Sequence, residues 1–321
     1  MNGPFLAGKF LSVYTSLRRS EIESVLSFYQ LAPLIRYTGI SAGIENSNYF
    51  LQTVQGDFVL TIYEHSTAEQ IMPYLGLLDE LGKHDNYYPV PLLDTKLEYL
   101  QELSGKSVAV FSCLPGESVQ QATEMQCRSV AKALARLHLQ SSSLAFQQAN
   151  PRNIAWIQAS VKSLGSHLSE QDAELLKDEL NYQCQYSILH LPQGIIHADL
   201  FKDNVLFKGD RLSGMLDFYA ACRDCYVLDI AIALNDWCVD AQGSYEQHRQ
   251  DVFIQAYQQQ RLITDDEQQY LPLLLRRACL RFWVSRLEHK LNPRQGEITQ
   301  IKDPESFKNL LLQHRHFAGV Q

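Results

Sequence analysis

The sequence of 321 residues lacks any apolar run of the roughly 18 residues that a membrane-spanning helix needs. The first charge is Lys9, and no basic segment followed by an apolar core, the pattern of a secretory signal, precedes or follows it. Glycine and proline number only 16 and 11, far fewer than in low-complexity chains. We therefore expect an ordered cytoplasmic protein without a membrane partner.

An excess of positive charge is also missing, because 28 lysines and arginines face 36 aspartates and glutamates. A net charge of -8 disfavours a phosphate backbone as ligand, so no nucleic-acid partner is expected. No repeat of 20 to 50 residues suggests a solenoid, and no obligate protein partner is readable. The length points to about two domains.

The seven cysteines are odd in number and scattered, which is typical of reduced thiols rather than of a disulfide framework. Cys222 and Cys225 form a C-x-x-C pair. A metal site would need a second ligand pair, and a redox motif would need a strand-to-helix context. Neither is evident, so we expect two ordinary thiols.

The first third of the chain is rich in strand patterns. Residues 48–54 and 58–63 flank a short turn with Gly56 and predict a hairpin. A helix is expected at 67–82, and a strand at 107–111.

The rest of the chain is mainly helical. Thr123 and Gln126 have the spacing of a capping box and open a helix. Further helices are expected at 170–182, 245–260 and 271–290, with a strand pair at 205–207 and 212–216. Strands first and helices later predict an α+β chain of two lobes. Its expected parts are an N-terminal extension (1–11), an N-terminal nucleotide-binding lobe (12–111), a hinge linker (112–118) and a C-terminal catalytic and acceptor-binding lobe (119–321).

The most informative motif runs from His197 through Asp199 to Asn204, and Asp217 follows 13 residues later. Phosphoryl transfer needs a carboxylate that orients the acceptor hydroxyl and oxygen ligands for magnesium. Asp199 and Asn204 have the spacing of the protein-kinase catalytic loop. A hairpin between Asn204 and Asp217 returns the chain, so we predict Asp199 as the base and Asn204 and Asp217 as magnesium ligands. The plainer alternative is that Asp199 and Asp217 only cap turns. His197 is expected to shape the loop through a structural hydrogen bond, with direct chemistry as its alternative role.

A glycine-containing segment precedes the first hairpin. Glycines let backbone N–H groups approach phosphate closely. Read alone, the segment is a generic turn; read with the downstream motif, it is a phosphate loop whose candidate contacts are Gly43, Asn46, Ser47 and Asn48.

Taken together, these motifs resemble the phosphotransferases related to aminoglycoside and choline kinases, and within them the bacterial homoserine kinases. The resemblance runs from about residue 12 to the C-terminus. The blocks that carry it are Ser12–Thr15, Gly43–Phe50, Phe58–Glu64, Ile196–Phe201, Asp217–Cys222, Asp229–Asn235 with Trp237 and Cys238, Leu280–Phe282 and Ser285–Leu287.

The resemblance implies a two-lobed protein-kinase-like fold, with an antiparallel sheet in the N-terminal lobe and helices in the C-terminal lobe. It implies ATP and Mg²⁺ as cofactors and transfer of the γ-phosphate to the hydroxyl of L-homoserine, a step of threonine biosynthesis. It places the adenine against the linker, at Ser112 and Leu114. Asp229 becomes a structural carboxylate below the active site, unless it only caps its own helix.

One departure concerns the phosphate-binding lysine of protein kinases, whose position falls at Thr61. The homoserine kinases that this chain resembles also have threonine at this position. His65 and Lys202 are the candidate replacements for its charge. Glu69 could be the helix glutamate of the upper lobe or an ordinary solvated residue.

An amino-acid acceptor needs a cation for its carboxylate, and arginine suits that role because it binds in a bidentate manner. Arg281 and Arg286 are the candidates, with Arg281 favoured, and a structural ion pair is the alternative for either. Tyr219 and Asp236 are candidates for the rim of the pocket.

Two other functions stay open. The same fold could phosphorylate an aminoglycoside, choline or a sugar derivative, and Asp236 and Asp240 keep a cationic acceptor in view. Thr61 also raises the possibility of a nucleotide-binding pseudokinase, although a protein that only binds has no use for a base at Asp199.

Overall fold

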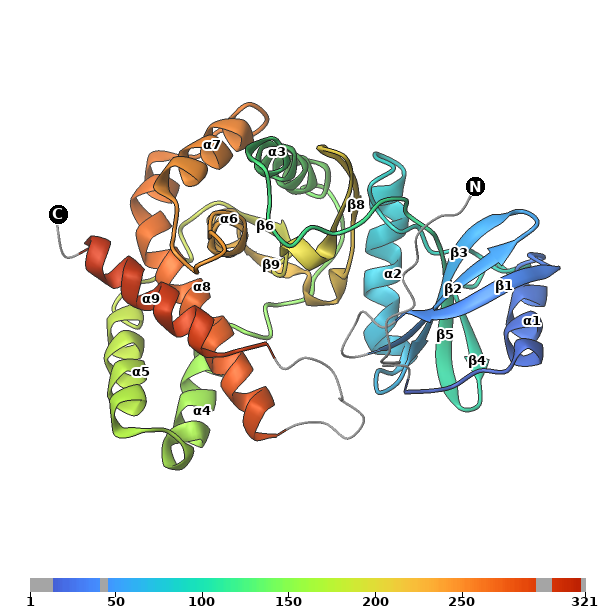
Figure 1. Ribbon diagram of the computed structural model, residues 1–321, viewed down its shortest axis with the longest axis horizontal. Helices are drawn as coiled ribbons and strands as arrows, with labels where there is room; N and C mark the ends of the chain where they lie inside the picture. The colour runs from blue at the N-terminus through green and yellow to red at the C-terminus, as the bar shows by residue number, and fades with distance from the viewer. Residues whose placement is uncertain (1–13, 41–45, 293–301, 319–321) are drawn as a thin grey trace. The chain divides into compact units, whose positions relative to one another are not determined.

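A computed structural model describes residues 14–40, 46–292 and 302–318 of the chain. These residues fall into two compact units, each described here by itself (Figure 1). The first unit comprises residues 14–79 and 89–113, and the second comprises 80–88, 114–292 and 302–318. Residues 80–88, which the predicted boundaries assign to the N-terminal lobe, group with the second unit. The predicted extension at 1–11 lies outside the described residues.

The first unit is built on a five-stranded antiparallel sheet with the order β1-β2-β3-β5-β4. The predicted hairpin is confirmed, since β2 and β3 pair from Asn46 with Tyr63 to Thr53 with Gly56. The strands are β1 (Leu34–Ile40), β2 (Asn46–Thr53), β3 (Gly56–Tyr63), β4 (Leu100–Leu103) and β5 (Lys106–Ser112), and the helices are α1 (Arg19–Phe28) and α2 (Ala68–Gly82), whose last turn belongs to the second unit.

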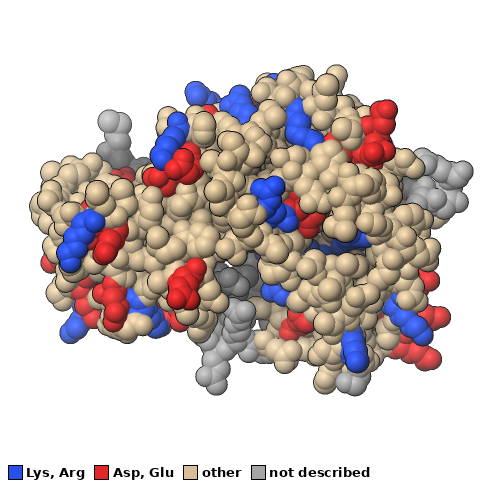
Figure 2. All heavy atoms as spheres, turned by 180° about the vertical axis from the view of Figure 1, so that it is seen from behind, with Lys and Arg blue, Asp and Glu red and all other residues tan. Residues whose placement is uncertain are grey.

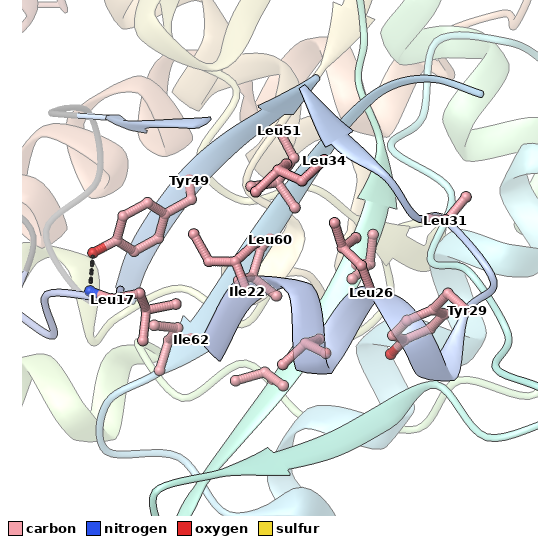
Figure 3. Packing of buried hydrophobic residues seen from close by; sticks show 13 residues of the cluster. Leu17, Ile22, Leu26, Tyr29, Leu31, Leu34, Tyr49, Leu51, Leu60 and Ile62 are labelled. Carbon is pink, nitrogen blue, oxygen red and sulfur yellow. Dashed lines mark hydrogen bonds between the residues drawn. The ribbon is translucent and has the colours of Figure 1, made fainter. Parts of the chain in front are cut away.

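Helix α1 packs on one face of this sheet (Figure 3). Its Ile22 and Leu26, one turn apart, are fully buried, and alternate residues of β2, including Leu51, point toward them. The Tyr49 hydroxyl accepts a hydrogen bond from the backbone N–H of Leu17 at 2.9 Å, and this bond ties the chain before α1 to the sheet. The opposite face of β2 therefore carries its even-numbered side chains, among them Asn48.

The second unit is mainly helical, and helix α6, buried except at Asp236, runs through its middle (Figure 1). Two small antiparallel sheets, β6 with β9 and β7 with β8, lie in the same unit. The helices are α3 (Glu124–Gln140), α4 (Ile154–Leu164), α5 (Glu170–Gln183), α6 (Tyr226–Trp237), α7 (Gln247–Gln258), α8 (Asp265–Leu291) and α9 (Glu305–Ala318), and the strands are β6 (Gln193–Ile196), β7 (Val205–Lys208), β8 (Arg211–Met215) and β9 (Cys222–Cys225).

The α+β class is thereby confirmed, and each expected helix is present. The Thr123 hydroxyl accepts the N–H of Gln126 and caps α3 as predicted. Helix α8 starts six residues before the expected position, because Thr264 and Glu267 form a second capping box there. Periodicity did not predict α6, since a helix that is buried on nearly all sides has no continuous polar face.

No helix among the described residues is long and apolar enough to span a membrane. On the face shown in Figure 2, lysine and arginine side chains are interspersed with aspartate and glutamate side chains.

Gly116 lies within the predicted linker, in the part that belongs to the second unit, and has no room for a side chain. Its φ is +122°, and a Cβ atom would lie 2.4 Å from the Ser213 hydroxyl and 2.7 Å from the Phe207 carbonyl oxygen. Gly116→Ala is expected to lower the free energy of unfolding by about 2–4 kcal/mol in urea titrations, because strain and overlap add. Gly105→Ala is the matched control: its φ is +79°, but its Cβ would meet nothing within 4 Å. Equal losses in the two variants would contradict the overlap.

Candidate active site

The site centres on the loop that follows β6, from His197 to Leu200. Ala198 has a left-handed backbone with φ +62°, which is uncommon for a residue with a Cβ atom. Asp199 directly follows this left-handed residue and is half-buried. A strained backbone persists only where its surroundings hold it, and three elements of the second unit do so.

Helix α6 supplies most of that support. Asp229 accepts the backbone N–H of His197 at 2.7 Å with one carboxylate oxygen and that of Ala198 at 2.8 Å with the other. Two turns further along the same face, Asp236 accepts the backbone N–H of Lys202 at 2.7 Å. The indole of the adjacent Trp237 donates to the Leu200 carbonyl at 2.8 Å. One helix face therefore holds the loop at both of its ends.

Behind Asp229 lies a fully buried chain of hydrogen bonds. His138 of α3 joins Asp229 at 3.0 Å through Nε2 and the Tyr257 hydroxyl at 2.6 Å through Nδ1. Burial acts to raise the pKa of Asp229, but the hydrogen bonds from His138 and His197 outweigh it and lower that pKa. Burial lowers the pKa of His138. Asp229 is thus a structural carboxylate below the loop rather than the cap of its own helix.

The strand pair β7–β8 brings Asp217 back to the loop. The Leu216 N–H donates to the Asn204 carbonyl at 2.8 Å, and the His197 ring is bonded to the Leu216 carbonyl at 2.9 Å. The Asn204 side chain donates to the Asp199 carbonyl at 2.8 Å and lies 3.3 Å from its carboxylate. The structure therefore brings Asp199 and Asn204 into contact. Asp217 directly follows Leu216, whose two backbone bonds tie it to the loop, and it is exposed with φ +60°.

Asp199 sits in an unusual electrostatic setting. Burial, and then the nearby Asp217 carboxylate, raise the pKa of Asp199 to about 7. Arg281 and Lys302 act in the opposite direction. Perturbed carboxylates of this kind are concentrated at functional sites, and a carboxylate beside a second one suits a cation-binding centre.

The two candidate acceptor arginines have different contacts. Arg281 is only 6% exposed, and its guanidinium donates to the Ala198 carbonyl at 2.9 Å, so it holds the loop from the side of α8. Arg286, half-buried, donates to the Asp303 carbonyl at 2.8 Å and to the Ser306 hydroxyl. Tyr219 lies half-buried in the short turn after Asp217. Arg281, which the sequence favoured as the contact for the acceptor carboxylate, thus already donates a hydrogen bond to the backbone of the loop.

In the first unit, the position of the missing lysine is filled by a polar pair. The Thr61 hydroxyl donates to the Asn48 side chain at 2.7 Å, and the two residues face each other across β2 and β3. Ser47 points the other way, where its hydroxyl accepts the Thr15 N–H at 3.0 Å and donates to Glu64. Asn46 begins β2. Gly43 lies outside the described residues.

The linker candidates are placed as follows. The Ser112 hydroxyl accepts the Val90 N–H at 3.0 Å within the first unit. Leu114 belongs to the second unit, where its side chain lies next to Gly214. His65 and Glu69 are exposed, and Lys202 is half-buried.

The C-x-x-C pair behaves as two separate thiols. Cys222 and Cys225 are buried at the two ends of β9, and neither forms a disulfide. Burial raises the pKa of Cys222 to about 12 and that of Cys225 further still. Within the part of the chain that the structure describes, no group of three His, Cys, Asp or Glu side chains could hold a metal ion.

The sequence suggested Asp236 for the rim of the pocket or for a cationic acceptor and did not predict its bond to the loop. It also overlooked the ion pair between Lys106 and the buried Glu64. A signal for Asp236 exists, because it lies seven residues after Asp229 and hence on the same helix face. The Lys106 pair joins the first residue of β5 to the residue that follows β3, 42 positions away, and has no local signal.

Comparison with known proteins agrees with this architecture. The sequence profile of the phosphotransferase enzyme family matches residues 36–273. A homoserine kinase of Neisseria meningitidis serogroup B is 40% identical over 308 residues, which cover 94% of this chain and 99% of that protein. A homoserine kinase of Methylobacillus flagellatus is 37% identical over 301 residues and covers 94% of both chains.

Solved structures share the fold at low identity. A spectinomycin phosphotransferase in complex with ADP and spectinomycin superimposes with a TM-score of 0.71 at 13% identity, over 92% of this chain and 97% of that one. An amicoumacin kinase in complex with AMP-PNP, Ca²⁺ and Ami superimposes with a TM-score of 0.69 at 15% identity, over 93% of this chain and 92% of that one. At such identities the likeness speaks for the fold alone.

Proposed function

Because the chain belongs to the phosphotransferase enzyme family, we propose that it transfers the γ-phosphate of ATP to the side-chain hydroxyl of L-homoserine. The observation that carries the transfer is the contact between Asp199 and Asn204, with Asp217 returned to the same loop by the Leu216 hydrogen bond. The choice of L-homoserine as the acceptor rests on relatives that are named homoserine kinase and match over nearly their full length. The reaction is then a step of threonine biosynthesis in the cytoplasm.

In this proposal Asp199 orients the acceptor hydroxyl and takes its proton as the oxygen attacks. The raised pKa of Asp199 suits that task, because a base works best when its pKa lies near the working pH. Asn204 keeps Asp199 in place, because its amide group is bonded to the carbonyl and the carboxylate of Asp199. Arg281 holds the preceding residue through the Ala198 carbonyl. The rate gain comes mainly from positioning.

The residues present fit a divalent cation. Burial and then the nearby Asp217 carboxylate raise the pKa of Asp199, so a cation would relieve the repulsion between the two carboxylates, and Asn204 adds an amide oxygen nearby. Oxygen donors of this kind are the ligands that Mg²⁺ prefers. We therefore propose that Asn204 and Asp217 hold Mg²⁺, which supplies neutralising charge for the triphosphate.

For the nucleotide, we propose that the segment around Gly43 and the residues Asn46, Ser47 and Asn48 contact phosphate, and that Ser112 and Leu114 contact the adenine. The hydroxyl of Ser47 is already hydrogen-bonded to Thr15 and Glu64 within the first unit. Asn48 is held by Thr61 and keeps its amide N–H₂ for a ligand.

Measuring ADP release from ATP and Mg²⁺ with L-homoserine, choline, an aminoglycoside and a sugar tests the proposal, with mass spectrometry of each product. Turnover confined to L-homoserine is expected. Turnover on another acceptor alone would remove homoserine but leave the roles of Asp199, Asn204 and Asp217. No turnover on any acceptor, with ATP still bound, would favour a pseudokinase.

Asp217→Asn is expected to shift the Mg²⁺ concentration for half-maximal rate upward by at least about tenfold, because one ligand loses its charge. Asparagine tolerates the left-handed backbone at this position, so the fold should persist. An Mg²⁺ titration of the rate, beside thermal unfolding as a control for folding, gives the measurement. An unchanged titration would remove Asp217 from the metal site.

A further inference from the structure

Two oppositely charged side chains near the catalytic loop have polar atoms that form no hydrogen bond with another described residue. They are Asp236, near the end of α6, and Arg286, near the end of α8. Both belong to the second unit, together with Asp199. No ion pair within 4 Å joins either side chain to an oppositely charged group among the described residues.

Asp236 is half-buried, and its one hydrogen bond from a described residue comes from the Lys202 N–H to Oδ2. Its Oδ1 therefore accepts nothing from the described chain. Burial raises the pKa of Asp236, while Lys202 and Lys302 act against that rise. A carboxylate in this state gains from a cationic hydrogen-bond donor.

Arg286 uses only Nη1 among its donors, for the Asp303 carbonyl and the Ser306 hydroxyl. Its guanidinium lies over the Phe307 ring at 4.3 Å, which fixes its plane. Burial lowers the pKa of Arg286, and four carboxylates act against that fall, Asp236 first and then Asp199, Asp203 and Asp303. The remaining N–H groups of a guanidinium fixed in this way suit a carboxylate.

An apolar wall borders the same region. The rings of Phe201, Phe282 and Phe307 lie 4.7 to 5.9 Å apart, centre to centre, and join the catalytic loop to α8 and α9. Such a wall shields charges from water and strengthens a hydrogen bond to a charged group. It also suits the methylene carbons of a short side chain.

We propose that Asp236 binds the α-ammonium group and Arg286 the α-carboxylate of the amino-acid acceptor, whose hydroxyl reaches Asp199. This inference rests on the proposed function and adds the recognition of a free α-amino acid. Arg281 is left out of the subsite, because its guanidinium is bonded to the Ala198 carbonyl beneath the loop. Acceptors that lack either α-group should bind poorly.

The test pairs each variant with a substrate that lacks the matching group. The compounds are L-homoserine, 3-aminopropan-1-ol, which has no carboxylate, and 4-hydroxybutyrate, which has no amine. Arg286→Ala is expected to lower kcat/KM for L-homoserine by about 10- to 100-fold, mostly through KM, and to change that for 3-aminopropan-1-ol less than threefold. Asp236→Asn is expected to lower kcat/KM for L-homoserine by a similar factor and to change that for 4-hydroxybutyrate less than threefold. The loop should keep its conformation, since asparagine still accepts the Lys202 N–H. Where turnover is slow, competitive inhibition constants replace kcat/KM.

Arg315→Ala is the matched control, because it removes an arginine of the same unit that pairs with Asp178. It should leave all three compounds unaffected. Equal losses on L-homoserine and its truncated analogue would overturn the subsite and assign Arg286 and Asp236 a structural role. Absence of wild-type turnover on L-homoserine, with turnover of a different acceptor, would instead overturn the proposed function and the subsite with it.

Discussion

Asp199→Asn is expected to lower kcat by about 10²- to 10⁴-fold, the usual contribution of a positioned general base. Asparagine has nearly the same shape and its oxygen still accepts from Asn204, so the loop should keep its conformation. ATP binding should change little, because the loss concerns the proton of the acceptor hydroxyl. Rapid-quench measurement of phosphate transfer, together with calorimetric titration of ATP, separates the two effects.

The control is Asp210→Asn, which removes an exposed carboxylate from the turn between β7 and β8. It should keep wild-type kcat. If Asp199→Asn also kept wild-type kcat, the base would have to be another group. A loss of ATP affinity as large as the loss of rate would move Asp199 to the nucleotide or its metal.

Much of this site could be predicted from the sequence because its members are local. Asp199 and Asn204 lie five residues apart, and a short strand pair connects Asn204 to Asp217. Hairpin registers follow from turn length and residue pattern, so the return of the chain was predictable. The magnesium ligands themselves stay a prediction.

The support of the loop could not be predicted in the same way. Whether the fixed guanidinium of Arg281 meets a ligand or the Ala198 carbonyl depends on how α8 crosses β6 and its loop, which is a tertiary fact. Ser47 likewise bonds to Thr15 and Glu64, residues 32 and 17 positions away. Sequence spacing reveals the face of a helix or strand but not what is packed against it.

Asp229→Ala is expected to have the largest effect on stability, about 3–5 kcal/mol in the free energy of unfolding. The substitution leaves the backbone N–H groups of His197 and Ala198 and the buried His138 without their acceptor. The left-handed backbone at Ala198 then loses the contact that holds it. Denaturant unfolding monitored by tryptophan fluorescence measures the loss.

Asp229→Asn shows whether the same contact also sustains the rate. Its single carbonyl oxygen serves only one of the two backbone donors, so the variant should fold with a smaller loss of stability yet lower kcat at least about tenfold, with KM for ATP little changed. Tyr257→Phe is the graded control, because it removes only the hydroxyl beyond His138 and should cost about 1 kcal/mol without affecting kcat. If Asp229→Asn lost stability but kept kcat, the carboxylate would support the fold alone, and the geometry of the loop would have to be maintained from α8 and Trp237.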